Sequence, residues 1–181
     1  MHIHGMIDSA FIERSRYYLA REYPAKIRLA VSDLPRQIVW WRQNEESNSI
    51  GNLLIHLAGN IRQWVVTGIG GIEGNRDRAA EFAARDGPEV SELLALLESA
   101  VRDADAVLAT LTPSDIDREL IIQGRKTTVL AALYHVVEHF SMHKGQILVI
   151  VKMLSPGSVR FYDDANGLAI PLWGGSEGVA R

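Results

Sequence analysis

Four of the six histidines in this chain are candidate metal ligands, and three of them have the spacing of ligands on one helix. His135, His139 and His143 follow one another at intervals of four residues, and His56 lies far upstream. Residues four apart share one helix face, with Cβ atoms about 5–6 Å apart, so two such imidazoles can reach one ion through bonds of about 2.0–2.1 Å. The three downstream histidines cannot all do so, because His135 and His143 are about 12 Å apart along a helix axis.

One neighbouring pair together with His56 therefore forms the predicted site. Three neutral imidazoles leave one position of a tetrahedral ion open, as catalytic zinc sites do. Without an ion, three buried imidazoles would need other partners for their nitrogens. We expect a divalent metal, zinc or nickel before iron, cobalt or manganese. The spacing alone leaves open whether the pair is His135 with His139 or His139 with His143.

The first of these pairs fits a motif of zinc peptidases. The segment from His135 to His139 matches H-x-x-E-H, in which Glu138 would be the general base of a metal-dependent hydrolase. The motif is short, and its usual third ligand is a carboxylate on a distant downstream helix, whereas only 38 residues follow His143. Glu138 also lies about 100° round the helix from His139, so it faces a neighbouring helix rather than the ion. The hydrolase is the weaker alternative.

Four amphipathic helices are expected to position these residues. Apolar side chains recur at helical spacing over residues 9–34, 49–68, 88–108 and 128–154, and Pro24 predicts a kink in the first of these helices. Because strand alternation does not persist anywhere, the fold class is all-α. The pattern predicts a four-helix bundle, and the long connection between the second and third helices allows a crossover.

The remaining segments are expected to be minor features of a single domain over residues 1–181. Residues 119–127 form two short β-prone runs around a glycine, which predicts a small hairpin before the last helix. The charged connection over residues 73–87 is interpreted as a solvated link. The bundle then covers residues 9–155, and an irregular tail covers residues 156–181.

The composition excludes several classes of function. Lys and Arg number 19 against 22 Asp and Glu, so the net charge of −3 offers no basic field for nucleic acid. Cysteine is absent, which excludes disulfides and thiolate ligands, so any sulfur chemistry must arrive with a substrate. We expect no membrane association and a cytoplasmic location, because the sequence shows neither a long apolar run nor a secretory signal.

Two motifs carry a resemblance to a known superfamily. Residues 52–64 read NLLIHLAGNIRQW, and the second motif, H-x-x-x-H-K-G-Q-I, begins at His139. Together they resemble the DinB/YfiT-like superfamily of metalloproteins, and an R-x-R-x-x-E-F segment at residues 76–82 resembles an uncharacterised branch of it. The resemblance covers residues 10–155.

The resemblance implies a site and a chemistry. It assigns His56, His139 and His143 to a divalent metal in a four-helix bundle that is commonly a homodimer, and it makes His135 a core or outer residue. Members with assigned activity use a low-molecular-weight thiol, as thiol S-transferases or isomerases. This implies a small-molecule substrate and thiol-dependent transfer. A metal-binding protein without catalysis is the alternative.

Further polar residues are candidates to orient the ligands or to bind substrate. Asn60 lies one turn after His56, with Gln63 close by, and Gln146 lies one turn after His143. Arg76 and Arg78 could receive an anionic group or serve a dimer contact, and the sequence does not decide between these roles.

Overall fold

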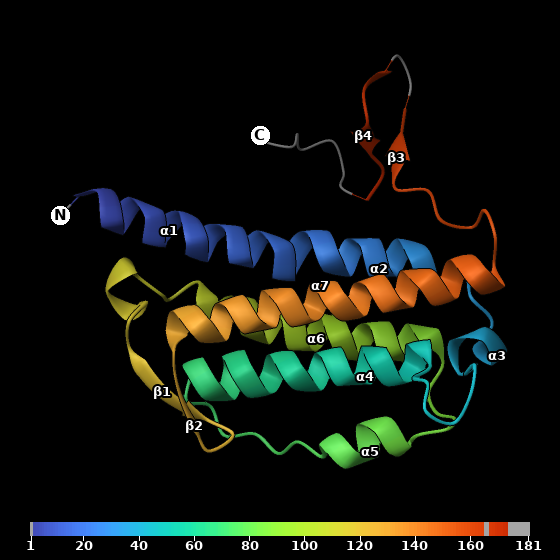
Figure 1. Ribbon diagram of the computed structural model, residues 1–181, viewed down its shortest axis with the longest axis horizontal. Coiled ribbons are helices and arrows are strands. Elements are labelled where there is room, and N and C mark those ends of the chain that lie inside the picture. Colours follow the sequence, from blue (N-terminus) through green and yellow to red (C-terminus); the bar gives the residue numbers. More distant parts are fainter. Residues whose placement is uncertain (1, 165–166, 174–181) are drawn as a thin grey trace.

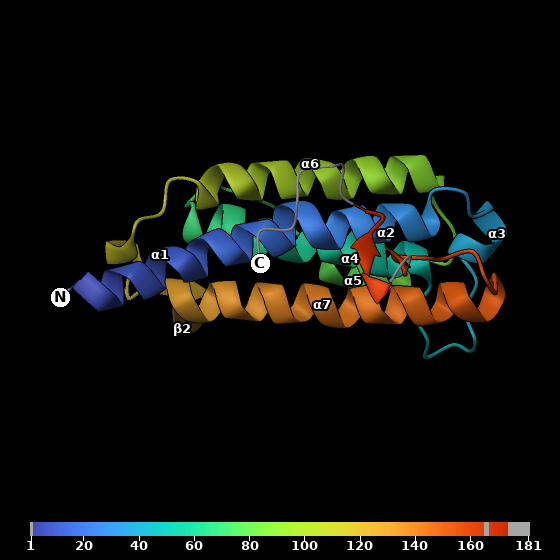
Figure 2. The ribbon, with the colours of Figure 1, turned by 90° about the horizontal axis from the view of Figure 1, so that it is seen from above.

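The computed structural model describes residues 2–164 and 167–173, in which four long helical rods lie side by side (Figures 1 and 2). The first rod is α1, η1 and α2, the second is α4 with η2, and the third and fourth are α6 and α7. Their bounds are α1 His2–Tyr17, η1 Tyr18–Glu22, α2 Tyr23–Val31, α4 Ile50–Ile61, η2 Arg62–Ile69, α6 Val90–Leu108 and α7 Val129–Leu154. The predicted all-α four-helix bundle is confirmed.

The directions of the four rods require a crossover, because two consecutive rods run the same way. In Figure 1, the first rod and α7 run from left to right, whereas α4 and α6 both run from right to left. The connection between η2 and α6 must therefore return along the whole length of the bundle. It carries α5 (Arg78–Ala83), which packs on the outside of α4.

Local sequence signals account for the helix boundaries near the site. Ser49 caps α4, since its hydroxyl accepts from the Asn52 backbone N–H at 3.1 Å while the Asn52 side chain accepts from the Ser49 N–H at 3.0 Å. The Thr128 hydroxyl caps α7 through the Ala131 N–H. Pro24 has no N–H to donate into the preceding turn, and the five-residue π-helix η1 lies directly before this part of the chain.

The first rod begins earlier than residue 9. The predicted helix starts at Ser9, a residue type that often caps helices, but the Ser9 hydroxyl donates to the Gly5 carbonyl from inside a helix that starts at His2. The bundle therefore extends to the N-terminal side of its predicted boundary.

The core lies between the four rods and fixes how α4 and α7 face each other. α4 contacts both α6 and α7, and its apolar residues are almost completely buried. The largest fully buried side chains are those of Leu19, Ile27, Ile50, Leu53, Leu54, Leu57, Ile61, Leu93, Leu97, Leu108, Leu133 and Phe140. At about 1.5–3 kcal/mol for each large apolar side chain, this burial is the main force that holds the two histidine-bearing helices together.

The predicted small hairpin is confirmed. β1 (Glu119–Ile122) pairs with β2 (Arg125–Thr128) in antiparallel fashion, and Gln123 and Gly124 turn the chain with φ of 54° and 74°. Short helices also form, α3 at Arg36–Val39 and η3 at Pro113–Asp115.

The tail is more ordered than predicted. β3 (Tyr162–Asp163) pairs with β4 (Ile170–Pro171), so it is not wholly irregular. Within the predicted tail, residues 165–166 and 174–181 lie outside the described residues. Among the residues described, no helix is both long and apolar enough to cross a membrane.

Candidate metal centre

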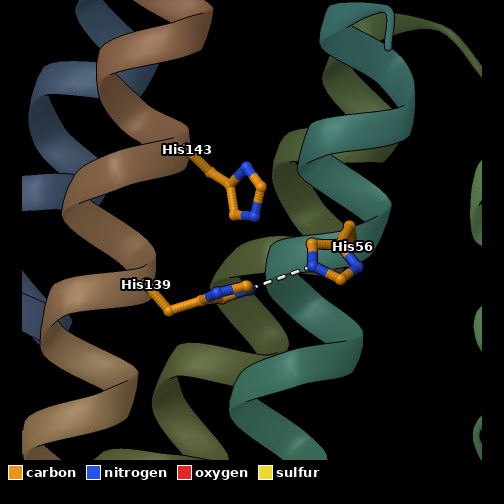
Figure 3. A group of neighbouring side chains, drawn as sticks. All are labelled: His56, His139 and His143. Atoms are coloured by element: carbon orange, nitrogen blue, oxygen red, sulfur yellow. Dashed lines mark hydrogen bonds between the residues drawn. The ribbon is translucent and has the colours of Figure 1, made fainter. Parts of the chain in front are cut away.

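Three histidines from two helices meet between α4 and α7 (Figure 3). His56 projects from α4 toward His139 and His143, and one nitrogen of each ring lies within 4.8 Å of the others. The Nε2 atoms of His56 and His139 are 2.9 Å apart. Two nitrogens bound tetrahedrally at about 2.0–2.1 Å lie roughly 3.3 Å apart, so small ring movements let all three reach one ion. The residues present therefore fit a metal site.

Burial lowers the pKa of two of these imidazoles, those of His139 and His143. The side chain of His56 is 3% exposed, His143 is also buried, and His139 is partly buried. Burial, followed by the nearby His143 and His56, lowers the pKa of His139 to about 3. Burial likewise lowers the pKa of His143, although its hydrogen bond with Gln146 opposes the shift. Lone pairs of His139 and His143 are thus available to a cation at neutral pH.

A buried carboxylate orients His56. Its Nδ1 lies 2.8 Å from Oε2 of Glu81 and 3.1 Å from Nη2 of Arg76. The ionised Glu81 carboxylate can only accept, so the shorter contact places the proton of His56 on Nδ1, and the longer contact with the guanidinium, which can only donate, is then not a hydrogen bond to this ring. A proton on Nδ1 leaves the lone pair on Nε2, the nitrogen that faces His139. The arrangement is the carboxylate–histidine pair that positions ligands in metal sites.

Gln146 has the same effect on His143. Its Oε1 lies 2.7 Å from Nδ1 of His143 and accepts the proton of that nitrogen. The lone pair of His143 is then on Nε2. Gln146 is thus placed where it could orient the ring of His143.

Arg76 and Glu81 form a buried two-point ion pair behind His56. Arg76 Nε lies 2.6 Å from Oε1 of Glu81, and Arg76 Nη2 lies 2.8 Å from Oε2. Burial alone would raise the pKa of Glu81, but hydrogen bonds from Arg76 and His56 bring it below its ordinary value. The segment interpreted as a solvated link therefore contains a buried residue of the site, and that interpretation was wrong. It failed because the crossover folds back against α4.

Gly59 makes room for this ion pair. A Cβ added at Gly59 would collide with Oε1 of Glu81 and would lie 2.9 Å from Nε of Arg76. The glycine, one turn after His56 on α4, thus allows the carboxylate to approach the helix backbone.

The side-chain amides of Gln63 and Asn60, predicted as candidates to orient ligands or bind substrate, have different contacts. Gln63 Oε1 accepts from Arg76 Nη1 and from Gln123 Nε2, each at 2.6 Å, and so ties the ion pair to the turn of the β1–β2 hairpin. Asn60 is buried, but no hydrogen bond joins its side chain to the cluster within the described part of the chain.

His135 lies outside the group of three. Its ring packs on Trp64 with a centroid distance of 4.1 Å, and Glu138 is exposed on α7. The geometry therefore brings together the second pair, His139 and His143, and leaves His135 and Glu138 of the H-x-x-E-H motif apart from the cluster.

The three histidines line an open pocket of about 570 Å³. The other lining residues come from the loop before α4, from the crossover and from α7: Arg42, Glu45, Glu46, Asn48, Arg78, Phe82, Arg85 and Met142. A larger hollow of about 1050 Å³ lies between η2 and α6, but it is lined by no histidine. The smaller pocket is therefore the one in which the chemistry of the cluster is accessible.

Comparison with known proteins shows the family of this chain. The model of the family described as "Protein of unknown function (DUF1572)" matches residues 7–165. The chain belongs to this family. The crystal structure of a DinB-like protein, YjoA from Bacillus subtilis, is similar with a TM-score of 0.62 and 23% identity, covering 83% of this chain and 97% of that one. The fold is thus DinB-like. No curated protein matches the chain.

Glu81 and Arg42 were missed as residues of the site. Glu81 belongs to the R-x-R-x-x-E-F segment whose resemblance was noted, but the residues of that segment gave no indication that its carboxylate would contact a histidine. Arg42 gave no signal, since it precedes a polar loop with ordinary turn composition.

Proposed function

We propose that this protein binds a divalent metal ion, zinc or nickel, through His56, His139 and His143, and uses it in an enzymatic reaction on a small molecule. The reaction class that fits best is thiol-dependent transfer. The observation that supports the proposal is the convergence of three imidazoles on the wall of an open pocket.

The protein's own residues prepare the site. Glu81 and Gln146 hold the rings of His56 and His143 in the tautomers that direct lone pairs inward. A metal bound by three neutral ligands lowers the pKa of a water or thiol in its remaining position. The chain contains no cysteine, so the thiol must be supplied by a substrate.

The pocket favours catalysis over a structural role. A structural metal site is closed by protein ligands, whereas a catalytic site keeps one position open. Here the pocket reaches all three histidines and has room for a small molecule.

The test uses protein loaded with one equivalent of Co²⁺, whose absorption reports its ligands. Added mercaptoethanol is expected to change that absorption, and turnover of an electrophile by the thiol is expected to disappear when the metal is chelated. If thiols leave the Co²⁺ spectrum unchanged and chelation does not alter turnover, the protein is instead a non-catalytic metal-binding protein.

A further inference from the structure

We propose that the pocket also contains a subsite for an oxyanion, formed by Arg78 and Arg42, so that the substrate is a small molecule with a carboxylate or phosphate group. The inference rests on the proposed function, because it assigns the substrate class of the same pocket. It is carried by two arginines that line the pocket with unused hydrogen-bond donors.

Arg78 is placed beside the histidines but is not neutralised. Its guanidinium carbon lies 4.9 Å from the ring centroid of Phe82, and that ring lies 4.6 Å from the ring of His56. Within residues 2–164 and 167–173, Arg78 has no ion pair and no hydrogen bond. Phe82 thus supports one face of the guanidinium, while its N–H donors remain available to a ligand.

Arg76 differs sharply from Arg78, although only one residue separates them. The side chain of Arg76 is 9% exposed, and its donors are occupied by Glu81 and Gln63. Arg76 therefore has neither of the roles that the sequence left open, because it supports the histidine cluster. Arg78 is the arginine free to meet an anion.

Arg42 supplies a second donor. Its Nε and Nη2 donate to the backbone carbonyls of Ser47 and Glu45 at 2.5 and 2.9 Å, which fixes the guanidinium at the pocket wall. Its Nη1 is buried and has no partner among the residues that the structure describes. A buried donor without an acceptor costs about 1–3 kcal/mol, and Nη1 gains an acceptor if an oxyanion bound at the pocket wall reaches it.

The balance of charge in the pocket also favours an anion. Three arginines line it against two glutamates. Of these glutamates, Glu45 lies 3.6 Å from Arg85 and its side chain is 92% exposed, so it points largely to solvent. A divalent ion on the histidines would add further positive charge.

The test compares two thiols of similar size, the anionic mercaptopropionate and the neutral mercaptoethanol, on protein loaded with Co²⁺. The unmodified protein is expected to bind mercaptopropionate at least about 10-fold more tightly, the effect of one added charge-assisted hydrogen bond. Arg78→Gln is expected to bring the ratio close to one while leaving the mercaptoethanol affinity and the Co²⁺ content unchanged. Arg42→Gln should lower the ratio as well.

The matched control is Arg102→Gln, which removes the same charge from an exposed position on α6 outside the pocket. Equal affinities for the two thiols, or a ratio that Arg78→Gln leaves unchanged, would overturn the subsite. If the protein takes up no Co²⁺ or binds neither thiol, the proposed function fails. The subsite is then decided on chelator-treated protein by ligand-observed NMR with mercaptopropionate, whose contact with the protein must depend on Arg78.

Discussion

Replacing His143 by alanine is expected to abolish stoichiometric metal binding, whereas His135→Ala leaves it intact. His143 contributes one of three nitrogens that lie within 4.8 Å of one another, and His135 instead packs on Trp64. Loss of an outer partner alone costs about 10–100-fold in metal affinity, so loss of a ligand should cost more than about 100-fold. The measurement is metal content per chain after dialysis against one equivalent of zinc.

These two variants also separate the two possible histidine pairs. Both remove one imidazole from the same helix, so a general effect on α7 would appear in both. Metal retained by His143→Ala and lost by His135→Ala would show that His135 and His139 form the pair and that the assignment made from the structure is wrong.

Glu81→Ala is expected to damage both the fold and the site. The change leaves the buried Arg76 guanidinium without its counter-charge, which typically costs about 3–5 kcal/mol. It also frees the Nδ1 proton of His56, so zinc affinity should fall by about 10–100-fold. Urea denaturation of the metal-free protein measures the first effect, and zinc competition with a chromogenic chelator measures the second.

Two further variants make this result specific. Glu138→Ala removes an exposed carboxylate from α7 and should change neither quantity. Gly59→Ala keeps Glu81 but places a methyl group against its carboxylate, so it should reproduce the loss of zinc affinity. A Glu81→Ala protein with unaltered stability and unaltered zinc affinity would show that the carboxylate does not support His56.

The fold could largely be predicted because helical periodicity is a local signal. The apolar periodicity of the second, third and fourth helices predicted most of their extent. Ser49 and Thr128, both capping residues, stand where two of these helices begin. The start of the first rod at His2 was missed, because Ser9 is a good cap that also tolerates a helix interior when its hydroxyl bonds the preceding turn.

The site could be predicted only in part. The histidines of α7 are close together in the sequence, whereas Glu81, which contacts His56, comes from the distant crossover. Spacing identified the histidines on α7 but permitted two pairs, and the rotation of α7 relative to α4 decides between them. Glu81 could not be derived, since its charged segment has the composition of a solvated loop until the crossover places it against Gly59.

X-ray absorption at the zinc edge of the protein loaded with one equivalent of zinc tests the three-histidine site most directly. We expect three imidazole nitrogens at about 2.0–2.1 Å and one additional light ligand, which mercaptoethanol replaces with sulfur. A spectrum with fewer than three imidazoles, or one dominated by carboxylate oxygens, would contradict a site built from His56, His139 and His143.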